Sequence, residues 1–216
     1  MSVWGQVFAA LYDRRMRSTE TAGLRAHREA LLGTASGDVL EIGGGTGANL
    51  PFYGDGVQTL TITEPDKPML RRLERRIGEL APQARLLRAP AEDLPFPDES
   101  FDVAVSTLVL CTVDDQARAL RELRRVLRPD GRLLFIEHVR AEDPKLARRQ
   151  DRFQPLHGRL ACGCRCNLAT LENIRAAGFE LAQVDRDTLK HAPSIVRPLV
   201  VGAALPTPEN ANRDHG

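Results

Sequence analysis

The spacing of apolar residues predicts alternating strands and helices between residues 38 and 139. Short apolar runs predict strands at 38–43, 59–63, 84–88, 101–110 and 132–139. Helix-period patterns predict helices from about residue 48, at 67–80 and at 114–127. This alternation predicts a doubly wound α/β sheet with helices on both faces.

The segments on either side of this region have different patterns. Residues 1–36 show helical spacing with an apolar face, and we interpret them as an N-terminal helical lid segment; that face holds Val3, Trp4, Val7, Phe8, Leu11 and Tyr12. Residues 143–165 are polar and irregular, and we assign 143–168 to an insertion over a substrate pocket. A helix is predicted at 169–177, ended by Gly178.

The last apolar runs, 179–185 and 196–205, stand close together and predict an antiparallel pair of strands at one sheet edge. The main domain is therefore assigned to residues 37–205. The polar segment 206–216 is expected to be a flexible tail. No internal repeat and no second domain are predicted.

Composition narrows the class of partner. The 216 residues are 42% hydrophobic and 27% charged, with a formal net charge of +1, so nothing favours nucleic acid. No apolar run approaches the roughly 20 residues that span a bilayer. No signal-peptide pattern is seen, so we expect a cytoplasmic protein with reduced cysteines, and at most a peripheral membrane contact through the first helix. The pattern does not predict the oligomeric state.

A glycine-rich loop follows the first predicted strand, in the stretch VLEIGGGTGA at 39–48. Glycines without side chains let a ligand approach the backbone closely. The spacing of Gly43, Gly45 and Ala48 suits a dinucleotide, and Glu64 stands near the distance expected of an acid that holds a ribose. However, Glu41 would repel a pyrophosphate, whereas it suits the ammonium and sulfonium groups of S-adenosylmethionine (SAM).

Several stretches beyond this loop carry a family resemblance. They are TEPD at 63–66, APAEDLPFPDESFDVAVSTLVL at 89–110 and RELRRVLRPDGRLLFIEHV at 121–139. With the glycine loop they resemble class I SAM-dependent methyltransferases over nearly the whole chain. The resemblance is to the subgroup of ubiquinone/menaquinone C-methyltransferases, phospholipid N-methyltransferases and, above all, animal thiol methyltransferases. It implies a Rossmann-like sheet of seven strands, the last one antiparallel.

The resemblance also implies a cofactor site, with SAM as methyl donor and S-adenosylhomocysteine as product. The methionine end is expected at Glu41, Gly43, Gly45, Gly47 and Asn49, and the ribose at Glu64. The adenine side is expected at Pro65, Asp66, Met69, Ala91, Glu92 and Asp93. The family pattern commonly has an aspartate where this chain has Pro90, so Ala91 and Glu92 must carry more of the adenine contact. Thr107 and Leu108 are expected near the sulfur, and Tyr12 is expected to close over the cofactor.

Methyl transfer to a protonated acceptor needs a general base. The candidate catalytic residues are His138 and His157, with Glu137 as an orienting or electrostatic group. We predict a small, apolar acceptor, with sulfur favoured over nitrogen and carbon. The alternatives are arsenite methylation, an NAD-dependent oxidoreductase and a SAM-binding module without catalysis.

Three of the four cysteines stand in one short stretch, Cys162, Cys164 and Cys166, and Cys111 stands apart. Soft thiolates suit zinc or trivalent arsenic. The spacing C-x-C-x-C is not the paired C-x-x-C of zinc sites, and no fourth ligand is evident. We therefore favour a metal-free loop of exposed thiols over the substrate pocket, and assign no metal ligand.

Overall fold

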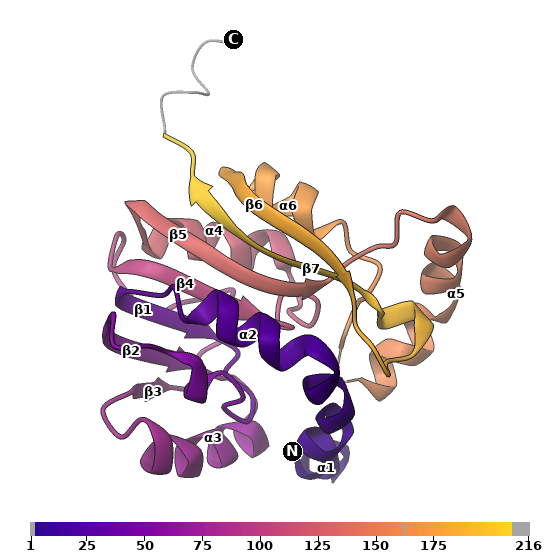
Figure 1. Cartoon of the computed structure of the whole chain (residues 1–216), viewed down its shortest axis with the longest axis horizontal. Helices are drawn as coiled ribbons and strands as arrows, with labels where there is room; N and C mark the ends of the chain where they lie inside the picture. The colour runs from indigo at the N-terminus through magenta and orange to yellow at the C-terminus, as the bar shows by residue number, and fades with distance from the viewer. Residues whose placement is uncertain (1–2, 162, 209–216) are drawn as a thin grey trace.

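The computed structural model of the chain describes residues 3–161 and 163–208, with side chains from Leu11 onward. Its strands are β1 (Gly37–Ile42), β2 (Val57–Thr63), β3 (Arg85–Leu87), β4 (Phe101–Thr107), β5 (Leu127–His138), β6 (Phe179–Thr188) and β7 (Pro198–Pro206). They form one sheet in the order β3-β2-β1-β4-β5-β7-β6 (Figure 1). Pairs among β1 to β5 are parallel, whereas β7 runs antiparallel to β5 and β6. The predicted doubly wound sheet with an antiparallel edge pair is confirmed.

The helices are α1 (Val3–Thr19), α2 (Arg25–Leu32), α3 (Lys67–Leu80), α4 (Gln116–Val126), α5 (Pro144–Leu160) and α6 (Thr170–Ala176). Short helical turns are η1 (Glu20–Leu24), η2 (Leu50–Phe52) and η3 (Ser194–Val196). One hydrophobic core lies between the sheet and α2 and α3, and a second lies between the sheet and α4 and α6. Val39 and Leu40 of β1 enter opposite cores, which explains why this central strand is apolar on both faces.

The predicted helix from about residue 48 is wrong. After β1 the chain forms turns and then only η2, and Tyr53 is already extended. Glycines penalise a helix, and Pro51 cannot donate a backbone hydrogen bond within one. The loop therefore reaches β2 without an intervening α-helix.

The segment 143–165, predicted to be irregular, is mostly the helix α5. Asp143 caps it by accepting a hydrogen bond from the Leu146 N–H, and Pro144 occupies its first turn. Its buried face includes Ala147 and Gln150, so an apolar stripe marking that face is missing from the sequence. A polar residue at a core position hid the helix from the pattern.

The N-terminal segment is helical as predicted, with a break. Gly23 has φ of 144°, which separates α1 from α2. Of the apolar face predicted for the first helix, the residues from Val3 to Phe8 lie outside the described side chains. Leu11 is described and is 45% exposed, so it is not packed on the domain.

Other boundaries shift by a few residues. β4 ends at Thr107 because Leu108 turns with φ of 60°. β5 begins at Leu127, which pairs with Phe101, and so starts before the strand predicted at 132–139. Of the predicted tail, Pro206 belongs to β7, and 209–216 lie outside the described residues.

Candidate functional site

The candidate site lies at the carboxyl end of β1, in the middle of the sheet. Its neighbours β2 and β4 lie on opposite sides of β1, so the strand order reverses here. Ligands of open α/β sheets bind in the crevice at such a reversal. The loop 43–47 starts directly after β1, and its Gly44 N–H donates to the carbonyl oxygen of Thr63 at the end of β2, over 3.0 Å.

The glycines of this loop are needed for two different reasons. Gly43, Gly45 and Gly47 have φ of 57°, 56° and 81°, where other residues are strained. A Cβ on Gly43 would lie 2.6 Å from the Val109 side chain, so packing also requires glycine there. Among the described residues, a Cβ on Gly45 would meet only the Gly43 carbonyl oxygen within 4 Å, at 3.9 Å. Gly45 therefore leaves open space beside its backbone, which fits a cofactor that approaches closely.

Glu64 connects the glycine loop to the end of β2. Its carboxylate accepts hydrogen bonds from the N–H groups of Gly45 and Asp66, each over 2.8 Å. Burial raises the pKa of Glu64, and the two backbone donors act in the opposite direction. Each carboxylate oxygen keeps a further lone pair for a ligand hydroxyl. The ribose contact predicted for Glu64 is chemically possible at this position.

Glu41 is buried below the loop with both carboxylate oxygens engaged. One oxygen accepts from Asn49 Nδ2 over 2.9 Å, and the other accepts from the Tyr53 hydroxyl over 2.7 Å. Burial raises its pKa to about 7, although both hydrogen bonds and the charge of Arg28 favour ionisation. A cationic ligand group near this carboxylate would stabilise its charged form. The contact with Tyr53 was not predicted from the sequence.

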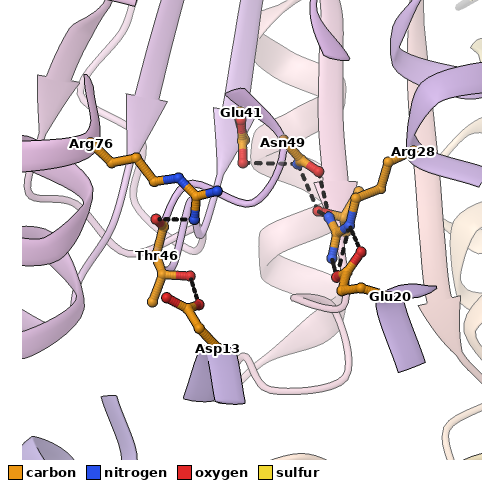
Figure 2. A network of polar contacts seen from close by, with 8 residues as sticks. Asp13, Glu20, Arg28, Glu41, Thr46, Asn49 and Arg76 are labelled. Atoms are coloured by element: carbon orange, nitrogen blue, oxygen red, sulfur yellow. Dashed lines mark hydrogen bonds and ion pairs between the residues drawn. The ribbon is translucent and has the colours of Figure 1, made fainter. Parts of the chain in front are cut away.

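Arg28 of α2 is a charged residue of the site that sequence reasoning missed. It is buried and donates to Glu20 over 3.1 Å, to Thr107 over 3.1 Å and to Asn49 (Figure 2). Asn49 in turn donates to Thr107 over 2.8 Å. The only sequence signal was a charge within the predicted lid segment, and this chain has many arginines.

Helix α1 reaches the glycine loop from the other side. Thr46 donates from its hydroxyl to Asp13 over 2.6 Å, and Arg76 donates to the Thr46 carbonyl oxygen over 3.5 Å (Figure 2). The half-buried Tyr12 next to Asp13 has its pKa raised to about 12, mainly by burial, with the charge of Arg28 opposing. The N-terminal segment therefore contacts the glycine loop, and its role as a lid stays a prediction.

The residues expected on the adenine side differ in their burial and in their hydrogen bonds. Asp66 caps α3 by accepting a hydrogen bond from the Met69 N–H, and Pro65 is exposed beside it. Glu92 accepts from the N–H groups of the two residues before α4, so its carboxylate holds that turn. Ala91 and Met69 are buried, whereas Asp93 and Pro65 are exposed. Their contact with adenine stays a prediction.

The ends of β4 and β5 form the other half of the site. Glu137 is fully buried, and one of its oxygens accepts from the Ser106 hydroxyl and from the N–H groups of Val109 and Leu110, over 2.7–3.0 Å. Burial raises its pKa to about 7. Glu137 therefore holds the turn that contains Leu108, which is a positioning task, and no hydrogen bond joins it to His138 among the described contacts.

The two predicted catalytic histidines lie near two buried cysteines. Cys111 and Cys164 are buried with their Sγ atoms 3.8 Å apart. The Cys111 thiol lowers the pKa of Cys164, and His157 and His138 act in the same direction. Burial lowers the pKa of His138. Within the described residues, Nδ1 of His138 and Nε2 of His157 are buried without a hydrogen-bond partner.

The cysteine stretch differs from the prediction in one respect. Cys164 and Cys166 are buried under α5, not exposed, because that unpredicted helix covers them: Gln154 bonds the Cys164 carbonyl oxygen, and Gln150 bonds that of Cys166. Cys162 lies outside the described residues. The described part of the chain holds no group of three or more His, Cys, Asp or Glu side chains placed to bind a metal ion.

None of the helices in the described ranges is both long and apolar enough to cross a membrane.

Known proteins with similar sequences are methyltransferases. A family model described as a methyltransferase domain matches residues 40–135. The chain is 37% identical to thiol S-methyltransferase TMT1B of Homo sapiens over 179 residues, covering 79% of this chain and 72% of that protein. It is 32% identical to thiol S-methyltransferase TMT1A of Homo sapiens over 202 residues, covering 92% and 82%.

The fold is shared with solved methyltransferases. A geranyl diphosphate methyltransferase determined in complex with SAM matches with a TM-score of 0.65 and 16% identity, over 84% of this chain and 85% of that one. The glycine loop with open space at Gly45, the acid at Glu64 and the matched family agree on one cofactor. The chain belongs to the class I SAM-dependent methyltransferases, and SAM is its cofactor.

Proposed function

We propose that this enzyme methylates the sulfur of a small, apolar thiol. The proposal rests chiefly on the group formed by Cys111, Cys164, His138 and His157. In this group, at the carboxyl ends of β4 and β5, the pKa of Cys164 is lowered whereas that of its neighbour Cys111 is raised. A thiol beside an ionised Cys164 is harder to ionise, as Cys111 is. An acceptor thiol placed there therefore needs a base to take its proton, and His138 and His157 belong to this group. The similarity to two thiol S-methyltransferases supports the same acceptor atom.

In the cofactor half of the site, the glycine loop and the two acids have separate roles. SAM, when bound, supplies a methyl group on a positively charged sulfonium. The backbone of Gly43, Gly45 and Gly47 lines the approach to the loop, and Glu64 accepts hydrogen bonds from ribose hydroxyls. Glu41 places a carboxylate opposite the ammonium of the methionine end, where positive charge lowers its raised pKa.

The acceptor half must remove a proton and exclude water. A short-chain alkyl thiol is less acidic than the thiol of cysteine, whose pKa is about 8.5, so it is mostly protonated at neutral pH. His138 is neutral because burial lowers its pKa, and its unpaired Nδ1 can accept that proton; His157 offers Nε2 as a second acceptor. Glu137 keeps the turn after β4 in place, so that Leu108 and Val109 form an apolar wall.

Methyl transfer to a short-chain alkyl thiol is the direct test. Purified protein is incubated with methyl-labelled SAM and the thiol, and label is counted in the organic layer. We expect saturable transfer that survives Cys162→Ser and Cys164→Ser, because the acceptor, not the protein, carries the reacting sulfur. Label on the protein itself is measured separately, since Cys164 is a thiol too.

Three outcomes would point elsewhere. SAM-induced stabilisation without transfer to any thiol contradicts the proposed acceptor and favours quinone or phospholipid acceptors, or a binding module without catalysis. Transfer to arsenite that is lost with the cysteines would assign the cysteine stretch to that substrate. Stabilisation by NAD instead of SAM contradicts the cofactor assignment, and is read from the same thermal melts.

A further inference from the structure

The outer face of α5 carries three exposed, large apolar side chains. Phe153, Leu156 and Leu160 are 42%, 60% and 50% exposed. At positions i, i+3 and i+7 they form one stripe along the helix. Elsewhere in the described part of the chain, exposed side chains of this kind stand singly, as Leu80 and Leu205 do. The stripe is therefore a concentration of apolar surface on one element.

The orientation of α5 is fixed by polar contacts on its other face. Gln150 is fully buried and donates to the carbonyl oxygens of Val139, Cys166 and Ile195 over 2.7–3.1 Å, while it accepts from the Ala141 N–H over 2.8 Å. Rotating the helix to bury the stripe would leave these backbone groups unsatisfied. Figure 1 shows α5 standing beside the sheet at the right of the view, with no helix or strand over its outer side.

The same helix is strongly basic. It contains five exposed cationic side chains: Lys145, Arg148, Arg149, Arg152 and Arg159. Within the ranges that the structure describes, none of the five forms an ion pair. The single acid of α5, Asp151, is already paired with Arg140 over 2.6 Å. At 100° per residue, Arg149 falls within the apolar stripe and Arg152 beside it.

The apolar stripe and the unpaired cations together limit which partner can bind the outer face of α5. A second copy packed face to face would bring two basic helices together, and like charges repel. A bilayer that contains anionic lipids satisfies both features, because the apolar side chains enter the boundary of the acyl chains while the arginines meet phosphates. We propose that α5 docks this enzyme on an anionic phospholipid surface.

Helix α5 lies between its exposed outer face and the acceptor half of the site, so docking through it would affect substrate access. The inner face of the helix carries His157 and Gln154, which contact the Cys164 region of the acceptor half. A helix in contact with lipid on one face and with the site on the other brings a lipophilic acceptor close to the reacting groups. This effect on access rests on the proposed function, whereas lipid binding by α5 does not.

Vesicle sedimentation with the full chain tests the docking without any methyl transfer. We expect binding to vesicles of phosphatidylcholine mixed with phosphatidylglycerol, much weaker binding to phosphatidylcholine alone, and weakening with added salt. The double variant Phe153→Ser/Leu156→Ser should lower the partition coefficient at least about tenfold. The matched control Leu80→Ser, an equally exposed leucine on α3, should bind like the wild type.

Two further variants test how much the arginines of α5 contribute to the preference for anionic vesicles. Arg149→Gln/Arg152→Gln should lose most of the preference for anionic vesicles, whereas Arg71→Gln/Arg75→Gln, the same change of charge on exposed positions of α3, should keep it. All these side chains are exposed, so unchanged thermal melts are expected and exclude unfolding as the cause.

Two results would overturn the proposal. The first is equal vesicle binding, or none at all, by wild type and both α5 variants. The second is a concentration-dependent dimer in light scattering that the Phe153→Ser/Leu156→Ser variant abolishes, which would assign the stripe to a second copy of the chain. Neither result bears on thiol methylation, so failure here is separable from failure of the proposed function.

Discussion

Thr46 of the glycine loop and Asp13 of α1 are joined by a hydrogen bond of 2.6 Å. The hydroxyl of Thr46 donates, and the Asp13 carboxylate accepts. The loop and the helix are 33 positions apart in the chain, so this contact is what ties the N-terminal segment to the cofactor loop. Thr46 is buried under α1, whereas Asp13 is exposed.

Removing this tie should weaken cofactor binding more than folding. In Thr46→Val the donor is lost and Asp13 is hydrated by solvent instead, so we expect the Kd for SAM to rise about fivefold, the equivalent of about 1 kcal/mol. Thr46→Ser keeps the hydroxyl and should bind SAM like the wild type. Isothermal titration calorimetry measures both; equal Kd values for the wild type and Thr46→Val would contradict a closing role for α1.

Arg28 should matter for stability as well as for the site. Arg28→Met leaves the Asn49 side-chain oxygen without its donor, removes one of the two donors to Thr107 and leaves the partly exposed Glu20 unpaired. We expect this to lower the free energy of unfolding by about 2–3 kcal/mol. Arg186→Met removes an exposed ion pair with Glu142 and should cost at most about 1 kcal/mol. Urea titration compares the two; similar losses would show that the Arg28 network contributes no more than a surface pair.

The raised pKa of Glu41 predicts a specific pH dependence of stability. The buried carboxyl has a pKa of about 7 in the folded state against 4.5 unfolded, so the folded state retains a proton that the unfolded state releases. The contribution of Glu41 is fully present below about pH 4.5 and is lost as the pH rises through 7, on the order of 3 kcal/mol. Glu41→Gln should lack this loss.

The measurement is the free energy of unfolding of the wild type and of Glu41→Gln between pH 4.5 and 8. Glu137 has a similar pKa and contributes to both proteins, so the difference between them isolates Glu41. A difference that does not change with pH would mean that Glu41 is ionised throughout.

Binding of SAM should release a proton through the same carboxyl. The ammonium of the methionine end favours ionised Glu41, so affinity should increase as the pH rises from 6 toward 8. Calorimetry in two buffers of different ionisation enthalpy counts the proton. Glu41→Gln should bind more weakly and release none; equal proton release by wild type and variant would place the titrating group elsewhere.

His138 should be needed in proportion to the acidity of the acceptor. His138→Asn should lower kcat/KM for an alkyl thiol by about 100-fold, the lower end of general-base effects. An aryl thiol, which is largely ionised at neutral pH, should be affected much less. Parallel rate measurements with both thiols decide this. An equal decrease for both would show that His138 positions the acceptor and does not take its proton.

Local sequence signals predicted most of the sheet and the loop beside it. Val39 and Leu40 face opposite cores, so β1 shows as a short continuous apolar run. The left-handed φ values of Gly43, Gly45 and Gly47 require glycine, which makes the loop visible as a motif. These features depend on residues next to one another in the chain, and a pattern can record them.

The tertiary structure alone decided what lies far apart in the chain. Helix α5 was missed because Gln150, a polar residue, occupies its core face and satisfies three carbonyl groups there. Arg28 reaches Thr107 across 79 positions, and Cys111 meets Cys164 across 53. Such pairs form only when folded elements bring side chains together, and no local periodicity encodes them. The sequence by itself determined the strands, the cofactor loop and the family. Packing decided which charged and sulfur-bearing side chains face each other at the ends of β4 and β5.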